Sequence, residues 1–206
     1  MEEKWIIKQA EFLTSAGTEG AYPAQLPCEI AIVGKSNVGK SSLINALTNN
    51  HKLAKTSSQP GKTRLINFFL LNRSLYLVDL PGYGFARTNR KNKEQWSGFI
   101  RKYLEEAPNL ALVCQLIDIR HKLMESDIEA YNWLTAGGLT VHVVLTKADK
   151  IGKNVAVSQR AAFKKALGLA DEQITAYSVL QPAMRLDFIN RIMASLEAGS
   201  EVTVEI

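Results

Sequence analysis

The chain has 206 residues, of which 46% are hydrophobic and 22% are charged, a composition typical of a soluble globular protein. This length predicts one domain, with or without extensions, that can bury a real core. The net charge of +5 permits a polyanionic partner without requiring one. The acidic start MEEKW does not resemble a signal peptide, and no apolar run approaches the roughly 18 residues of a membrane span, so we expect a cytoplasmic protein. Cys28 and Cys114 lie far apart and outside any metal-binding motif, and the apolar run LALVCQLID around Cys114 favours a buried, reduced thiol there.

The order of the apolar runs predicts alternating strands and helices. A strand-like piece, WIIKQAEFL, and a loop rich in Gly, Ala and Pro come first. The buried strand EIAIVG, a helix after Gly39, and a hairpin of LINFFLL and SLYLVDL across Asn72-Arg73 follow. The remaining elements are a helix over Lys93–Glu106, the strand LALVCQLID, the helix ESDIEAYNWLTA, the strand LTVHVVLT, a helix near Ser158–Leu167, the strand QITAYS and the helix MRLDFINRIMASL.

This alternation predicts an α/β fold, a three-layer sandwich around a mostly parallel sheet. We expect the main domain to span 28–199, with an N-terminal extension packed on it over 1–27 and a C-terminal tail over 200–206. In such sheets ligands bind at the carboxyl ends of the strands, so the loops that follow the strands are expected to carry the function.

The loop after EIAIV reads GKSNVGKS and matches the phosphate-binding pattern G-x-x-x-x-G-K-[ST], between the strand and the helix that the pattern requires. Gly34 and Gly39 permit a tight turn whose N–H groups face phosphate oxygens. Lys40 reaches the outer phosphates, and the Ser41 hydroxyl can ligate Mg²⁺. The flanking elements disfavour the alternative, a glycine-rich turn that matches by chance. The residues expected to bind a nucleotide here are Gly34, Lys35, Ser36, Asn37, Val38, Gly39, Lys40, Ser41 and Ser42.

The segment TKAD ends a later strand and fits the [NT]KxD pattern of guanine-binding proteins. Asp149 can accept hydrogen bonds from N1–H and the 2-amino group of guanine, whereas adenine would leave this carboxylate unpaired. The Lys147 stem can lie along one face of the base. Alone, such a segment is usually a polar loop, but downstream of a phosphate loop it indicates guanine. The expected base-binding residues are Thr146, Lys147, Ala148 and Asp149, with the backbone of Tyr177, Ser178 and Val179, where many GTPases read Ser-Ala and Val179 departs from them.

The segment DLPG follows the strand SLYLVDL and is interpreted as a nucleotide sensor rather than a simple hairpin turn. Asp79 can hold a water on Mg²⁺, and the Gly82 N–H can contact a γ-phosphate only when that phosphate is present. A second sensor is expected in TSSQPGKTRL, where Thr63 can complete the Mg²⁺ shell; Thr56 is a rival that lies further from the strand. The nucleotide contacts expected in these loops are Gly61, Lys62, Thr63, Arg64, Leu65, Asp79, Leu80, Pro81 and Gly82, and the metal-binding residues are Ser41, Thr63 and, through water, Asp79.

Together, GKSNVGKSSLIN, TSSQPGKTRLINFF, DLPGYGFA, DIRH and VLTKADK make the chain resemble the EngB/YihA family of bacterial GTPases, from about Ile7 to the last helix. The phrases PGKT-x-x-INFF and VDLPGYGxA are more specific than the general motifs. The resemblance implies a Ras-like P-loop G domain of the TRAFAC class, with a six-stranded sheet in which one strand is antiparallel. It also implies GTP, Mg²⁺, a role in assembling the large ribosomal subunit, and a link to normal cell division and septation.

Lys40, Thr63 and Gly82 are the expected catalytic residues. Tyr83 stands where Ras-like enzymes have a water-orienting Gln, so we expect slow intrinsic GTP hydrolysis with assistance from a partner or a cation. Asn37 matches the Asn of GTPases that use K⁺ beside the phosphates. An asparagine that merely tolerates a left-handed turn is an equal alternative.

The segment ARTNRKNKEQWSGFIRKY is strongly basic and directly follows the expected γ-phosphate sensor. This position favours contact with an RNA backbone, while a solvated helix face is the alternative. The candidate RNA-binding residues are Arg87, Arg90, Lys91 and Lys93.

Three classes of function stay open. The leading one is a GTP-switched assembly factor, expected to be a monomer, that docks on ribosomal RNA and protein. The second is a P-loop nucleotide kinase, against which TKAD and the lack of an acceptor-binding insertion argue. The third is the GTPase module of a tRNA-modification or transport system. Such proteins carry further domains or membrane spans, which this sequence does not show, and this argues against the third class.

Overall fold

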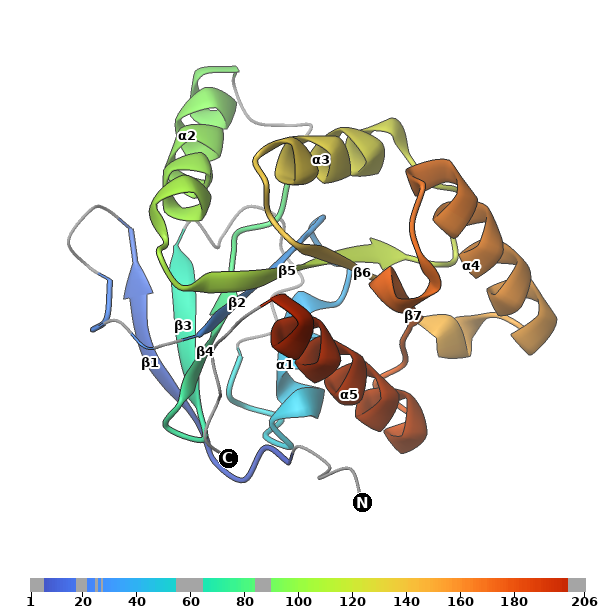
Figure 1. The fold of residues 1–206 in the computed structure, drawn as a ribbon, viewed down its shortest axis with the longest axis horizontal. Helices are drawn as coiled ribbons and strands as arrows, with labels where there is room; N and C mark the ends of the chain where they lie inside the picture. The colour runs from blue at the N-terminus through green and yellow to red at the C-terminus, as the bar shows by residue number, and fades with distance from the viewer. Residues whose placement is uncertain are drawn as a thin grey trace.

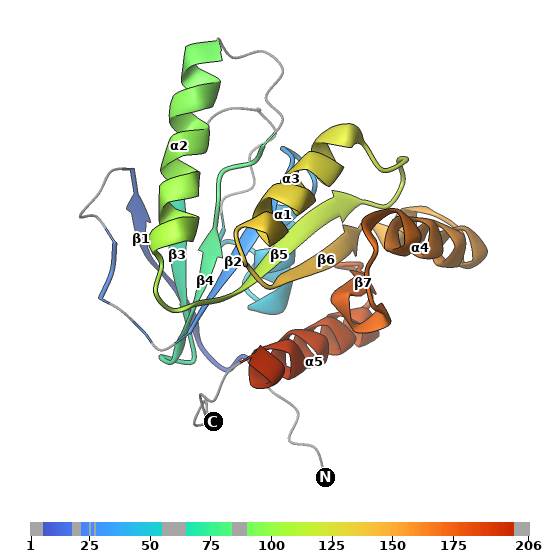
Figure 2. The ribbon, with the colours of Figure 1, turned by 45° about the horizontal axis from the view of Figure 1, so that its top comes forward.

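A seven-stranded sheet lies between layers of helices in the described part of the chain (Figures 1 and 2). The computed structural model describes residues 6–17, 22–24, 26, 28–54, 65–83 and 90–199, without the side chains of 90–97 and 197–199. In spatial order the strands are β1 (Ala10–Ala16), β3 (Ile66–Leu71), β4 (Leu75–Asp79), β2 (Glu29–Gly34), β5 (Leu110–Asp118), β6 (Val141–Thr146) and β7 (Ile174–Ala176). Only β3 opposes its neighbours in direction, so the prediction of a three-layer α/β sandwich with a mostly parallel sheet is confirmed.

The seventh strand, β1, exceeds the six that the family resemblance implies. It lies at the sheet edge, antiparallel to β3. Asn72, in the turn of the predicted β3–β4 hairpin, ties the chain there: its side-chain oxygen accepts hydrogen bonds from the N–H groups of Lys8 (2.8 Å) and Gln9 (3.1 Å), and its amide donates to the carbonyl of Ile6 (2.9 Å). The strand-like pattern of WIIKQAEFL is visible in the sequence, but its partner strand is not, because the tie comes from an asparagine far along the chain.

The described helices are α1 (Lys40–Leu47), α2 (Arg90–Glu106), α3 (Glu125–Ala136), α4 (Lys153–Leu167) and α5 (Pro182–Gly199), with short 3₁₀ turns at Ala148–Lys150 and Asp171–Gln173. Three of them, α2, α4 and α5, start earlier than predicted. In the first turns of α4 the apolar residues Val155 and Val157 are exposed. The apolar residues of this stretch therefore do not follow the spacing of a buried helix face, and the sequence pattern does not show where the helix begins. Pro182 is the first residue of α5. Proline is tolerated there because the N–H group that it lacks would have no hydrogen-bond partner within the helix at that position.

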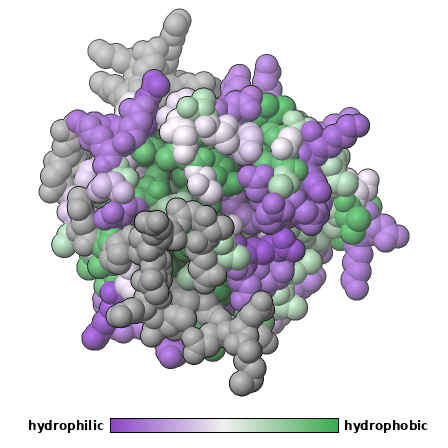
Figure 3. Space-filling model, viewed as in Figure 1, coloured by the Kyte–Doolittle hydropathy of each residue, from purple (hydrophilic) through white to green (hydrophobic). Residues whose placement is uncertain are grey.

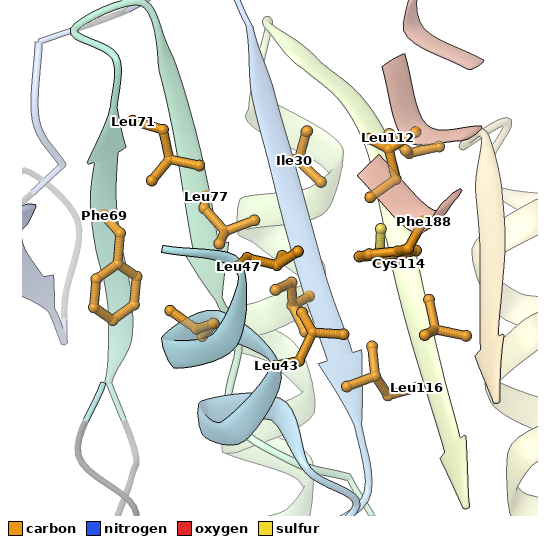
Figure 4. Close-up of a cluster of buried hydrophobic side chains, with 14 of the residues drawn as sticks. Ile30, Leu43, Leu47, Phe69, Leu71, Leu77, Leu112, Cys114, Leu116 and Phe188 are labelled. Carbon is orange, nitrogen blue, oxygen red and sulfur yellow. The ribbon is translucent and has the colours of Figure 1, made fainter. Parts of the chain in front are cut away.

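Helices α1 and α5 cover one face of the sheet, and α2, α3 and α4 cover the other (Figures 1 and 2). Figure 4 shows Leu43 of α1 and Phe188 of α5 facing Cys114 and Leu116 of β5 in the first of these cores. Cys28 and Cys114 are both buried in it, and burial raises the pKa of their thiols to about 11 and about 12. The prediction of a buried, reduced Cys114 is confirmed, and Cys28 is likewise buried and free.

The surface seen in Figure 3 mixes hydrophilic and hydrophobic side chains. Within the residues that the structure describes, no helix has both the length and the apolar character that a bilayer span demands.

A buried hydrogen bond anchors α2 to the start of β2. The Tyr103 hydroxyl donates to Glu29 Oε2 over 2.7 Å, and Glu29 is only 7% exposed. Burial raises the pKa of Glu29, and the Tyr103 hydrogen bond acts against that rise. The Tyr103 ring also packs edge-on against Phe68 of β3. The helix that follows the DLPG loop is therefore fixed to the sheet at its C-terminal half.

We expect Tyr103→Phe to lower the free energy of unfolding by about 1.5–3 kcal/mol, because the buried Glu29 carboxylate loses its donor. The measurement is urea unfolding at pH 8. Tyr76→Phe is the matched control: its hydroxyl donates to the neutral carbonyl of Ala24 over 2.9 Å, so the expected loss is about 0.5–1.5 kcal/mol. Equal losses for the two variants would contradict the anchoring role of the charged pair.

Candidate functional site

Five loops follow parallel strands and lie at the same end of the sheet, where the carboxyl ends of these strands meet. They are 34–41 after β2, 79–82 after β4, 118–121 after β5, 146–149 after β6 and 177–179 after β7. Ligands bind at this end of the sheet in such folds. Leu65 precedes β3, and because β3 runs the other way its start lies at this same end. The predicted phosphate, sensor and base motifs are thus brought together.

The phosphate loop turns sharply between β2 and α1. Asn37 has φ 61° and Gly39 has φ 115°, both in the left-handed region that glycine and asparagine tolerate best. A Cβ on Gly34 would lie 2.8 Å from the carbonyl oxygen of Leu116, so only glycine fits where the loop leaves the sheet. The first turn of α1 carries no acidic residue, which leaves its N–H groups and dipole free to attract an anion.

Lys40 and Asp79 form the charged centre of the site. Burial lowers the pKa of the half-buried Lys40, and the charge of Asp79 raises it again. Asp79 is 6% exposed, and burial raises its pKa, although the charge of Lys40 and the Asn67 side chain act against that rise. Asp79 Oδ1 is buried and has no hydrogen-bond partner among the described residues. The carboxyl group therefore has one oxygen that no described residue satisfies, close to Lys40 at the start of α1.

Two hydrogen bonds join the TKAD segment to the phosphate loop. Thr146 Oγ1 donates to the Val38 carbonyl over 2.7 Å. Lys147, with φ 62°, donates from Nζ to the Asn37 carbonyl over 2.8 Å, and the same ammonium pairs with Asp118 Oδ2 at 2.8 Å. The predicted base-binding segment and the predicted phosphate-binding loop are one connected unit.

The Asp149 carboxylate is held by its neighbours. The Ser178 hydroxyl donates to Asp149 Oδ1 over 2.7 Å, and the Lys150 ammonium lies 3.4 Å from Oδ2. Burial raises the pKa of Asp149, but hydrogen bonds from Ser178, the backbone and Lys150 outweigh it and lower the pKa. The Tyr177 side chain lies in the core, whereas the Val179 side chain is exposed. The loop 177–179 is predicted to offer only backbone N–H groups. The Ser178 side chain also fixes the orientation of Asp149, the carboxylate predicted to bind the base.

Gly82 lies directly against the phosphate loop. A Cβ at this position would sit 3.0 Å from the Gly34 carbonyl oxygen and 3.0 Å from the Ser36 nitrogen. The next residue, Tyr83, forms a parallel β-bridge with Lys35, which continues the β2–β4 pairing beyond the strand ends. The sensor is therefore seated on the backbone that would hold phosphate.

The Tyr83 side chain is held in a polar cluster around Asp127 and Gln115. Its hydroxyl donates to Asp127 Oδ1 over 3.0 Å and accepts from Gln115 Nε2 over 3.1 Å. The Lys35 ammonium pairs with the other carboxylate oxygen, Asp127 Oδ2, at 2.9 Å. Lys35, predicted to bind nucleotide, is thus left with only its backbone for that purpose.

Three residues at this end of the sheet are not among the predicted site residues, namely Gln115 and Asp127, which hold Tyr83, and Asp118, which holds Lys147. Ser178 is predicted for its backbone, and its hydroxyl also holds Asp149. Burial raises the pKa of Asp118, but hydrogen bonds from Arg120 and Lys147 outweigh it and hold that pKa well below its usual range. Asp118 ends β5 within the phrase DIRH, so an aspartate at a carboxyl strand end is a signal that can find it. Gln115 and Asp127 give no such signal.

Several predicted residues lie outside the described part of the chain, namely Thr56, Gly61, Lys62, Thr63, Arg64 and Arg87. Arg90, Lys91 and Lys93 belong to the first turns of α2, and their side chains are not described. Further along α2, Arg101 pairs with Glu105 and Lys102 with Glu106, four residues apart on an exposed helix surface. For these two cations the solvated helix face is the better interpretation.

Comparisons with known proteins agree with this arrangement. Residues 29–147 match the sequence profile of a family described as "50S ribosome-binding GTPase". The chain is 46% identical to a probable GTP-binding protein EngB of Geobacter metallireducens, over 97% of this chain and 98% of the relative. It is 44% identical to a probable GTP-binding protein EngB of Clostridium perfringens, over 92% of this chain and 97% of that protein.

Solved structures give the same result at the level of the fold. A crystal structure of a probable GTP-binding protein engB superposes with a TM-score of 0.69 at 25% identity, over 83% of this chain and all of that one. Era in complex with MgGDPNP and nucleotides 1506–1542 of 16S ribosomal RNA superposes with a TM-score of 0.65 at 26% identity, over 87% of this chain and 59% of Era. With its phosphate loop, its TKAD segment and relatives that match along nearly the whole chain, this protein belongs to the EngB family of GTP-binding proteins.

Proposed function

We propose that this protein binds GTP with Mg²⁺, hydrolyses it slowly, and acts in the cytoplasm as a nucleotide-switched factor in assembly of the large ribosomal subunit. The link to cell division and septation rests on the family resemblance. The observation that carries the nucleotide part is Asp79: a buried carboxylate with an unpartnered oxygen stands beside Lys40, at a glycine loop that opens a helix. Such a group is expected where a metal ion and phosphates bind.

The residues of the loop fit a magnesium-bound triphosphate. Backbone N–H groups of 34–42 and the Lys40 ammonium would hold the phosphates, and the Ser41 and Thr63 hydroxyls would ligate Mg²⁺ directly. Asp79 would hold a water of the metal through its unpartnered oxygen. Mg²⁺ supplies neutralisation of the charge that develops between the outer phosphates during transfer. Gly82, seated against the loop, is the group that a γ-phosphate would contact first.

Guanine recognition by Asp149 gives the safest test. Asp149→Asn should weaken GTP binding by about tenfold to a hundredfold and favour xanthosine triphosphate, because an amide donates where the carboxylate accepted. The measurement is a competition titration with GTP, XTP and ATP. Lys150→Gln, which removes only an exposed partner of Asp149, is the control and should change GTP affinity little. Equal binding of ATP and GTP by the unmodified protein would refute guanine specificity.

The hydrolytic step depends on what orients water. The Tyr83 hydroxyl is engaged by Asp127 and Gln115, which supports slow intrinsic turnover without a side chain in the role of the Ras glutamine. We therefore expect Tyr83→Ala to change the single-turnover rate little. A large fall in that rate would assign Tyr83 a direct catalytic role.

K⁺ is proposed as a second cofactor, held beside the phosphates by Asn37. Replacing K⁺ by Na⁺ should then lower the GTP hydrolysis rate, and both Asn37→Ala and Asn37→Gly should remove that difference. The glycine variant separates the alternatives, because glycine accepts the left-handed φ of 61° without supplying an amide. If Asn37→Gly keeps full stimulation by K⁺, Asn37 serves only the turn.

The ribosomal part of the proposal is supported by the family profile described as "50S ribosome-binding GTPase" and by the basic segment after the sensor. In the GTP state, contacts of the γ-phosphate with Gly82 and Thr63 would order the loops on either side. Arg87, Arg90, Lys91 and Lys93 would then form one basic surface, and ordering charges in advance lowers the entropic cost of binding RNA.

Neutralising Arg87, Lys91 and Lys93 together should weaken binding to large ribosomal subunits and reduce its salt dependence by about one unit of slope for each lost phosphate contact. The measurement is a salt titration with a non-hydrolysable GTP analogue and with GDP. Arg101→Gln/Lys102→Gln is the matched control, since both cations are already paired with glutamates on the same helix. A triple variant with unchanged affinity and slope would leave the segment as a solvated helix face.

A further inference from the structure

Three polar side chains lie in a row across β1, β3 and β4, at the end of the sheet where Asp79 ends β4. Ser15 of β1 is paired with Asn67 of β3, and Asn67 is paired with Asp79 of β4. Residues directly opposite each other in antiparallel strands point to the same face of the sheet. That face is the one covered by α1, because Asn67 and Asp79 stand two residues from Phe69 and Leu77, which belong to the core that α1 covers. The edge strand β1 therefore presents a side chain toward the nucleotide site.

A β-bulge decides which residue of β1 takes this place. Phe12 faces Phe69 and Thr14 faces Phe68, so Leu13 is an extra residue without a partner in β3. With regular pairing, Thr14 would stand opposite Asn67 and Ser15 would turn to the other face, because side chains alternate along a strand. The bulge thus brings the Ser15 hydroxyl into line with Asn67.

The hydrogen bonds in this row have a fixed direction. The Ser15 hydroxyl donates to Asn67 Oδ1 over 2.7 Å, so the amide oxygen of Asn67 faces β1. The NH₂ group of the same amide is then left on the side of β4, where Asp79 stands directly opposite Asn67. Ser15 therefore stabilises the one orientation of the Asn67 amide that serves Asp79.

This support leaves the metal-facing side of Asp79 free. The buried Oδ1 has no partner among the described residues, while Asn67 stands directly opposite Asp79 on β3 and its amide acts against the rise in the pKa of that carboxyl group. A neighbour held on one side of the carboxyl group restricts its rotation, so that the unpartnered oxygen keeps a constant position. Such support matters at metal sites, where losing an outer partner of a ligand typically costs 10- to 100-fold in metal affinity.

We infer that Asn67 is a positioning residue for Asp79 at the Mg²⁺–nucleotide site, and that Ser15 of the N-terminal strand orients Asn67. The inference rests on the proposed binding of guanine nucleotide with Mg²⁺. It assigns β1 a part in the nucleotide site although β1 contacts neither phosphate nor base.

The test separates metal binding from nucleotide binding. Release of a fluorescent GDP analogue is followed while Mg²⁺ is titrated, and GDP affinity is measured separately in EDTA. Asn67→Leu, of similar size but without an amide, should raise the Mg²⁺ concentration for half-maximal retention of GDP by about 10- to 100-fold and leave affinity in EDTA within about twofold. Asn67→Ala gives the same comparison with less bulk should leucine prevent folding.

Ser15→Ala should raise the half-maximal Mg²⁺ concentration less, by about three- to tenfold, and should add nothing in the Asn67→Leu background, since it acts only through that amide. Thr14→Ala is the matched control, because this neighbouring hydroxyl residue stands opposite Phe68 on the other face. It should leave the Mg²⁺ requirement unchanged.

Two outcomes overturn the inference. Lower thermal stability of Asn67→Leu and Asn67→Ala with an unchanged Mg²⁺ requirement would mean that the row only stabilises the sheet, and the proposed function would stand. An effect of Ser15→Ala that persists in full in the Asn67→Leu background would remove Ser15 from the chain of support. By contrast, an unmodified protein that binds neither GDP nor GTP would overturn the proposed function itself.

Discussion

The phosphate loop can exist only if its outward-facing carbonyl groups find donors, and the rest of the site depends on this constraint. When consecutive N–H groups turn inward to meet an anion, the carbonyls between them turn outward. Thr146 and Lys147 supply the donors, to Val38 and Asn37. The segment proposed to bind the base therefore also supports the loop proposed to bind the phosphates. A change at the end of β6 would be felt at both ends of a bound nucleotide.

Much of the fold and of the site is predictable from the sequence because it rests on local patterns. Buried strands such as β2 and β5 are apolar runs, and Gly39 and Lys40 stand at fixed spacings in a known loop. The support of these groups is not local. Asn72 holds β1, Ser178 holds Asp149 and Asp127 holds Tyr83, each from another part of the chain. Nothing near these residues in the sequence reveals the contact, because folding alone creates it.

The cluster around Asp127 shows that the role expected for a side chain from a sequence motif can differ from the contacts that it makes in the structure. In the sequence, Lys35 is a cation inside a phosphate-binding motif and Tyr83 is an odd residue after DLPG. In the structure both are bound by one carboxylate that is 3% exposed. Leaving such a carboxylate unpaired inside the protein is costly, so its partners are held firmly. The cluster therefore fixes the sensor and the first turn of the phosphate loop to the start of α3.

The pairing of Lys35 and Lys147 with aspartates also affects which anions the site can accept. Both cations are neutralised within the protein, at 2.9 Å from Asp127 and 2.8 Å from Asp118. Attraction in the described loop then comes mainly from backbone N–H groups and from Lys40, and these act only over short distances and in fixed directions. Such a site discriminates by shape rather than by total charge. A polyanion such as RNA, drawn to a protein of net charge +5, gains little by entering it, so nucleotide and RNA need not compete for the same surface.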